Sequence, residues 1–405
     1  MRLKSAPRRI HMPRSSLAKT FLALAACHWL VDCYGGMWPI FKFLADLDLS
    51  RAGLIVTVAV FIGAGLQPLF GLLSDGGGQR RLILFGAALS SLGMLLGPVT
   101  FLRDSLSSSA WYGLMFLIMV TTCTGQGMFH PAATSAAGNL HGPRRSVLVA
   151  LFIASGMFGF SMSQGLFSFV FRTTRAHTEW MLIPAGLILL CGWRWCRPSR
   201  RHLAIDHPMR ERLADLAAVR RPLTMLFLFE VFMGAMYHGF IFLMPEFLQD
   251  SGCPDWMIRG GGYFFWVAGS ATLMIPLGHA ADRLGGKRML VGCSAIAILL
   301  YYTVVLPQAL PWWWYMPLLF LAGGFGGAAN PMGVAMGQRL APQQASVVSG
   351  ILMGLAWAAA SPAMWLAGAL AEHPSLGVVK AIWMLGGSGL IALVLAFFVQ
   401  TEENG

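Results

Sequence analysis

The sequence predicts an all-α membrane protein of twelve transmembrane helices in two six-helix halves, with the N- and C-termini cytoplasmic. Three observations predict this fold class: the composition, the number of apolar segments and the distribution of basic residues. Of the 405 residues, 56% are hydrophobic and 11% are charged, and the mean hydropathy is +0.64. Because a soluble domain carries about 25% charged residues, the composition does not fit a soluble enzyme. The seven cysteines are too few for a disulfide scaffold and show no CxxC spacing that would indicate a metal or redox site.

Twelve apolar segments follow one another along the chain. A transmembrane helix needs about 20 mostly apolar residues, and twelve of them leave short loops here. The segments of the first half start near Phe21, Ala52, Leu82, Trp111, Ser146 and Glu179. Those of the second half start near Leu223, Gly260, Met289, Trp312, Ser346 and Leu376. The domains are then a basic cytoplasmic tail (1–19), the N-terminal half (20–196), a cytoplasmic linker (197–221), the C-terminal half (222–400) and a short cytoplasmic tail (401–405).

The basic residues give the orientation of these segments. With the N-terminus inside, 22 of the 29 Lys and Arg residues fall in the tail, the linker and the other cytoplasmic stretches, and seven, Lys42 among them, fall outside. Cytoplasmic loops of membrane proteins are enriched in Lys and Arg. The net charge of +12 therefore indicates membrane orientation, and we expect no nucleic-acid partner.

The two halves share a loop motif. After the second segment, Gly71 and Asp75 precede a glycine turn and the basic pair Arg80-Arg81, and after the eighth segment Gly278 and Asp282 precede a similar turn. Halves of equal helix number are typical of transporters built from internal repeats. This repeated loop resembles that of the major facilitator superfamily, and the resemblance implies that it takes part in conformational gating. The gating residues are then Gly71, Asp75, Arg80, Arg81, Gly278, Asp282, Arg283, Lys287 and Arg288.

Further motifs are similar to those of the fosmidomycin-resistance branch of that superfamily. The first segment reads His-x-x-x-Asp at 28–32, and the fourth reads Phe-His-Pro at 129–131. The resemblance implies a twelve-helix secondary transporter, often a proton-driven exporter. Two positions depart from the branch: Ala132 stands where an acid is common, and the fifth segment has no Gly-Pro pair.

His28 and Asp32 are the predicted proton-coupling pair. Ionisable groups at membrane depth are costly and mark functional sites by default. Residues four apart share one helix face, so the imidazole and the carboxylate can meet and exchange a proton. The alternative is a structural tether in which His28 bonds a backbone carbonyl.

Other polar residues at depth are predicted to bind substrate. Pro131 breaks the helix beside His130, and Asn330-Pro331 forms a second such break in the tenth segment. Glu230 lies in the seventh segment, the counterpart of the first, and either faces the centre or the lipid headgroups. The predicted substrate-binding residues are His130, Glu230, His238, Tyr237, Gln126, Gln164 and Asn330.

We interpret the chain as a secondary active transporter of a small organic molecule, with proton-coupled efflux by alternating access. The predicted protein is a monomer in the bacterial inner membrane, with substrate, protons and the lipid bilayer as partners. No catalytic residue, cofactor or resident metal is predicted, since no nucleotide-binding loop occurs. An importer or facilitator of a metabolite or siderophore-like compound is the alternative, which the departures at Ala132 and in the fifth segment favour. A membrane sensor or an intramembrane enzyme is the remote alternative.

Overall fold

The computed structural model describes residues 14–138, 140, 145–196, 217–305, 310–399, and every regular element among them is helical. Within these described residues, ten helices are long and apolar enough to cross a membrane by themselves. Two more crossings complete the predicted twelve. The first crossing is divided into two helices at Gly35-Gly36, and the sixth combines a short 3₁₀ turn with a helix that ends at Trp195. The twelve-helix fold class is thus confirmed.

Several crossings are interrupted where the sequence contains glycine or proline. The first crossing breaks at Gly35-Gly36, and Pro39 lies in the first turn of its second part. The second crossing breaks at Leu66, before Pro68. Proline lacks the N–H that would continue the helical ladder. The N-terminal half contains α1 (Arg14–Gly35), α2 (Trp38–Leu44), α3 (Leu49–Gly65), α4 (Gln67–Leu73), η1 (Ser74–Gly78), α5 (Gln79–Ser91), η2 (Leu92–Leu95), α6 (Leu96–Val99), η3 (Thr100–Leu102), α7 (Ser108–Gly138), α8 (Arg145–Thr173), η4 (Thr178–Met181) and α9 (Leu182–Trp195).

The second half is interrupted at different crossings. Its seventh crossing runs unbroken, whereas the eleventh is divided at Gly350 and Ser361. The C-terminal half contains α11 (Arg220–Asp250), η5 (Met257–Gly261), α12 (Gly262–Leu284), α13 (Gly286–Val305), α14 (Trp312–Leu340), η6 (Pro342–Gln344), α15 (Ala345–Ser349), η7 (Gly350–Leu355), α16 (Ala356–Ala360), α17 (Pro362–Ala371) and α18 (Gly377–Phe398). Most of the predicted linker, 197–216, lies outside the described residues.

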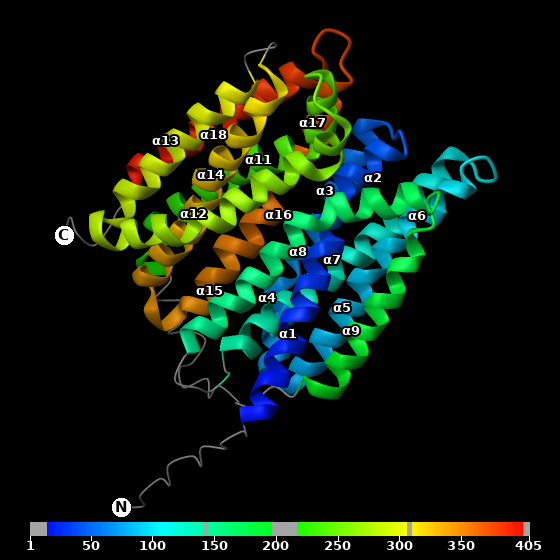
Figure 1. Cartoon of the computed structure of the whole chain (residues 1–405). Coiled ribbons are helices and arrows are strands. Elements are labelled where there is room, and N and C mark those ends of the chain that lie inside the picture. The colour runs from blue at the N-terminus through cyan, green and yellow to red at the C-terminus, as the bar shows by residue number, and fades with distance from the viewer. Residues whose placement is uncertain (1–13, 139, 141–144, 197–216, 306–309, 400–405) are drawn as a thin grey trace, which may run out of the picture.

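The bundle has two ends. We call the end where α1 begins and α18 finishes the terminal end, and the opposite one the far end. The two halves meet mainly toward the far end, where α3 packs along α17, α2 contacts α11, and η5 contacts α8. Figure 1 shows α2, α3 and α17 gathered at the upper right. By contrast, α4, which approaches the terminal end, contains no buried residue.

Glycines permit the closest approach between the halves. A Cβ at Gly53 would lie 2.5 Å from the backbone oxygen of Met364, and one at Gly368 would lie 2.1 Å from that of Leu49. Hydrogen bonds accompany this contact, since Thr57 donates to the Ser361 carbonyl at 2.9 Å and Ser361 donates to the Thr57 carbonyl at 3.1 Å. The interface between α3 and α17 is therefore both close and polar.

Candidate functional site

His28 is held in one orientation by α8. Its Nδ1 lies 2.8 Å from the carbonyl oxygen of Phe152, and the two rings are stacked with centroids 4.2 Å apart. A carbonyl oxygen only accepts hydrogen bonds, so Nδ1 is the donor. The predicted tether to a backbone carbonyl is present, and it leaves Nε2 to face Asp32, whose Oδ2 is 3.3 Å away.

The Asp32 carboxylate lies between two imidazoles. His130, from α7, places its Nε2 3.4 Å from Asp32 Oδ1. When His28 is neutral, its Nδ1 carries the ring proton and its Nε2 presents a lone pair toward the carboxylate. Two lone pairs attract only when a proton lies between them. A proton on His28 Nε2 would therefore form a hydrogen bond to Asp32, while Nδ1 keeps the proton that it donates to the Phe152 carbonyl.

Gly156 on α8 makes room for this cluster. A Cβ at this position would lie 2.4 Å from His28 Nε2 and 2.5 Å from Asp32 Oδ2. One ligand atom from each of His28, Asp32 and His130 lies within 4.8 Å of the others, so the same set could hold a divalent cation. The side chains of Asp32 and His130 keep 17% and 33% of their exposure, so both can be reached by a proton or solute.

A second polar pair occupies the other half. Glu230 on α11 is 3% exposed and accepts a hydrogen bond from Asn330 Nδ2 at 2.7 Å. Its other oxygen, Oε1, is buried without a hydrogen-bond partner among the described residues. This oxygen fits beside Gly333 only because glycine has no Cβ. Glu230 consequently packs inside the half, and the headgroup-facing alternative for this residue is wrong.

The two pairs are related by the internal repeat. In each half, the residue before a proline in the fourth helix meets an acid on the first helix: His130-Pro131 meets Asp32, and Asn330-Pro331 meets Glu230. Proline frees a backbone carbonyl and disturbs the helix locally. Both helices nevertheless run through their prolines without interruption, so the predicted helix breaks are absent, and each proline instead lies beside a residue that contacts an acid of the same half.

Tyr237 and His238 face aromatic residues rather than Glu230. The Tyr237 ring lies 5.5 Å from Trp266 and 6.4 Å from Trp357, and His238 packs edge-on to Trp357 at 4.7 Å. His238 bonds the backbone of Ala360, while its Nδ1 is buried without a hydrogen-bond partner among the described residues. These residues form an aromatic wall of the C-terminal half.

The two predicted glutamines lie in different settings. The Gln126 side chain is half-buried against α1, where a Cβ at Gly35 would lie 2.2 Å from its Nε2. Gln164 is 1% exposed, and neither polar atom of its amide has a hydrogen-bond partner within the described part of the chain. Gln164 lies at the contact between α8 and η5, where Gly260 comes close to the backbone of Gln164 and Gly165.

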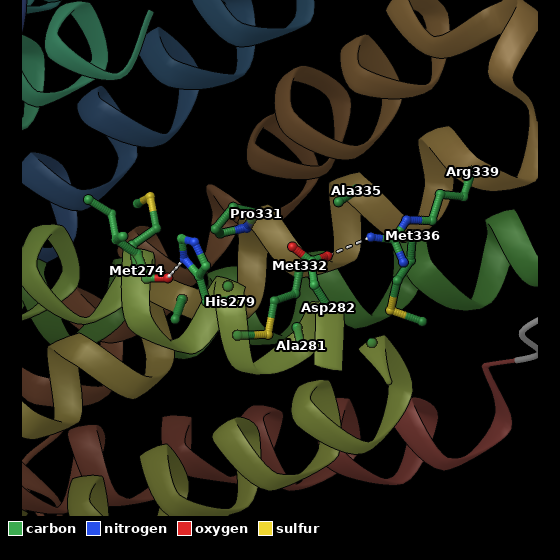
Figure 2. Close-up of a pocket in the computed structure, with 13 residues that line it drawn as sticks. Met274, His279, Ala281, Asp282, Pro331, Met332, Ala335, Met336 and Arg339 are labelled. Carbon is green, nitrogen blue, oxygen red and sulfur yellow. Dashed lines mark hydrogen bonds and ion pairs between the residues drawn. The ribbon is translucent and has the colours of Figure 1, made fainter. Parts of the chain in front are cut away.

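The repeated loop motif is built as expected in its turns. Gly77 and Gly285 have φ of 99° and 96°, the left-handed conformation that glycine adopts without strain. Asp282 accepts a hydrogen bond from Arg339 of α14 at 2.9 Å, as Figure 2 shows, and Arg80 donates to the Trp193 carbonyl. The side chain of Asp75 lies outside what the structure describes.

The remaining motif residues line the terminal end. Arg81, Arg283 and Arg288 are exposed and Lys287 is half-buried. The motif glycines make no close helix contact in this conformation: a Cβ at Gly278 would meet nothing within 4 Å, and one at Gly71 only Pro131, at 3.8 Å. A pocket of about 350 Å³ between α12 and α14 is lined by Asp282, His279 and apolar residues (Figure 2).

Sequence reasoning missed two features of this region. Lys42, assigned to an exposed outer stretch, is instead buried in α2 and bonded to Glu246 of the other half. Tyr263 of the C-terminal half reaches Gly36 and Ser163 of the N-terminal half. The apolar run from Trp38 to Leu44 could have predicted that Lys42 lies in a helix. By contrast, no pattern in the sequence indicates that Tyr263 lies near Gly36.

Comparison with known proteins agrees with this architecture. The family model described as Major Facilitator Superfamily matches residues 20–361. The Fosmidomycin resistance protein of Escherichia coli (strain K12) is 23% identical over 379 residues, which cover 89% of this chain and 88% of the relative. An uncharacterized MFS-type transporter of Bacillus subtilis (strain 168), YfnC, is 21% identical over 95% of both chains.

Solved structures share the fold. A D-xylose-proton symporter superposes with a TM-score of 0.77 at 14% identity, covering 96% of this chain and 99% of its own. A point mutant of the nucleoside transporter NupG superposes with a TM-score of 0.75 at 12% identity, covering 94% of this chain and 99% of its own. At such low identity, these similarities establish the fold alone.

Proposed function

The chain belongs to the major facilitator superfamily, and from this premise we propose that it exports a small organic molecule in exchange for protons, by alternating access to one central site. Membership makes the protein a multi-pass inner-membrane transporter of small molecules rather than an enzyme. The proposal concerns the coupling ion, the direction and the residues that carry them.

The observation that carries proton coupling is the Asp32 carboxylate between two imidazole Nε2 atoms, at 3.3 and 3.4 Å. His28, fixed by Phe152, can exchange only the proton on its Nε2, and His130 is the more exposed of the two rings. A proton entering through His130 can pass to Asp32 and on to His28 without any large movement. Protonation changes the charge of the site, which is what couples a proton to substrate binding.

Substrate would bind between this cluster and the aromatic wall of the other half. Half-buried Gln126 and His130 offer hydrogen bonds from the N-terminal half, and Tyr237, His238 and Trp357 offer ring faces from the C-terminal half. Adaptable aromatic and methionine surfaces suit varied organic substrates. Glu230, bonded to Asn330, would adjust the polarity of this half.

Export is the direction we favour. One relative is named for resistance to fosmidomycin, and an exporter confers resistance by lowering the internal concentration of a compound. The predicted inside-positive charge distribution would then place the terminal end in the cytoplasm, where substrate enters.

Proton movement in proteoliposomes with a pH-sensitive dye tests the proposal. A panel of anionic, cationic and neutral compounds should include at least one that drives proton flux, and Asp32→Asn should abolish that flux while substrate binding persists. Asp104→Asn, at an exposed far-end position, is the matched control and should behave as wild type. A chelator should have no effect if the cluster carries protons rather than a metal. Full coupled flux in Asp32→Asn, or compound movement without any proton flux in the wild type, would contradict the coupling role.

A further inference from the structure

Lys42 and Glu246 form a buried ion pair between the two halves. Lys42 lies in α2 and Glu246 in α11, 204 residues further along the chain, and the ammonium donates to Glu246 Oε1. The Lys42 side chain has no exposure and that of Glu246 has 14%. The Lys42 Nζ also lies 4.6 Å from the centre of the Phe242 ring.

Each charge of this pair depends on the other half for its partner. A buried charge is costly unless it is paired. Glu246 is the carboxylate that pairs with Lys42. Its second oxygen, Oε2, is buried and has no hydrogen-bond partner among the described residues. If α2 separated from α11, each charge would lose its partner and would have to be hydrated instead.

We propose that the Lys42–Glu246 pair is the latch of the far end, which holds the two halves together there and separates when the central site opens to that side. This inference rests on the alternating-access part of the proposed function. It adds the residues that set the balance between the two states. In the closed state the charges satisfy each other, and in the open state water satisfies both.

A second contact between the halves at the same end is more exposed. Glu372 accepts hydrogen bonds from the backbone N–H groups of Leu49 and Ser50, at 2.5 and 3.2 Å, where α3 begins. A carboxylate at a helix N-terminus is favourable, but solvent replaces it readily at an exposed position. The enclosed pair is therefore the contact on which closure depends most.

The latch predicts a specific order among variants. In Glu246→Gln, the fully buried Lys42 loses its carboxylate partner in the closed state, so this variant should favour the open far end most. Lys42→Met should do so less, because Glu246 retains some exposure. The double variant Lys42→Met with Glu246→Leu leaves no unpaired charge and should stay closed. The exchanged pair, Lys42→Glu with Glu246→Lys, should recover closure in part, since the cation would leave the Phe242 ring.

Distances between spin labels across the far end test this order. Labels on a keto-bearing unnatural residue at exposed positions 105 and 374 avoid replacing the native cysteines, and the protein is studied in nanodiscs without substrate. Glu246→Gln should raise the ratio of open to closed populations at least about tenfold, and the double variant should match the wild type. An unchanged distribution in Glu246→Gln would overturn the latch. A double variant as open as the single ones would also overturn it, because packing rather than charge would then be responsible.

The same experiment separates the latch from proton coupling. The label distances need neither a substrate nor a proton gradient. A shift in Glu246→Gln alongside unimpaired flux in Asp32→Asn would contradict the coupling role and leave the latch standing. Coupled flux that is lost in Asp32→Asn, with no shift in Glu246→Gln, would contradict the latch alone.

Discussion

At the scale of single residues, the proposed coupling site depends as much on an absent side chain as on the charged ones. His28 and Asp32 share one face of α1, and α8 can pack against that face only because Gly156 has no Cβ. The backbone of α8 then brings the Phe152 carbonyl to His28 Nδ1. The orientation of the imidazole thus follows from helix packing.

Gly156→Ala should impair coupling while leaving the fold intact. The added methyl group would lie 2.4 Å from His28 Nε2 and 2.5 Å from Asp32 Oδ2, so one of these side chains must move. Since a displacement of about 1 Å can lower a rate ~100-fold, we expect substrate-driven proton flux to fall ~10–100-fold. Gly165→Ala, on the same helix, is the matched control because its Cβ would meet nothing within 4 Å. Equal flux in the two variants would show that Gly156 does not position the pair.

The residue scale also shows how far sequence reasoning reaches. The His28–Asp32 pair follows from a spacing of four, and a residue before proline at depth indicated His130 and Asn330. Contacts between helices have no such signal: the pairing of Lys42 with Glu246 spans 204 residues, and the role of Gly156 depends on a neighbouring helix. Periodicity describes one helix at a time, so the partners across an interface come only from the structure.

At the scale of helices, α3 and α17 form the closest seam between the halves. Gly53 and Gly368 let the backbones approach, and the hydrogen bonds that join Thr57 and Ser361 hold the register. Small residues commonly permit such approach between membrane helices. Under the proposed alternating access, this seam must separate and reform without rearranging either helix.

Gly368→Ala should separate α3 from α17. Its Cβ would lie 2.1 Å from the Leu49 carbonyl oxygen, a backbone atom that cannot rotate away. Overpacking of this kind costs about 1–3 kcal/mol, all of it in the state with the far end closed. We expect longer distances between labels at positions 105 and 374 and a lower transport rate. Gly387→Ala on α18, where a Cβ meets nothing within 4 Å, should change neither; the same distances in both variants would argue against the seam.

At the scale of the whole molecule, hydropathy and repeat symmetry predicted the architecture correctly because the membrane restricts the choice of fold. Every backbone polar group must be satisfied inside the hydrocarbon, so an apolar chain of this length can only form helices or a closed barrel. The first crossing still differs from the simple prediction, since it continues through Gly35-Gly36 into α2. Lys42 was predicted to lie in an outer loop, but because of this continuation it lies buried at the interface between the halves.

The orientation of the molecule follows from its basic residues and is open to direct measurement. Because 22 of the 29 Lys and Arg residues belong to the predicted cytoplasmic side, the terminal end should face the cytoplasm. A cysteine at exposed position 107, between η3 and α7, should react with a membrane-impermeant maleimide in intact cells. A cysteine at exposed position 283, in the last turn of α12, should react only after permeabilisation. Wild-type protein gives the background, since its described cysteines are buried or half-buried. The reverse labelling pattern would invert the topology, and with it the side to which the Lys42–Glu246 latch opens.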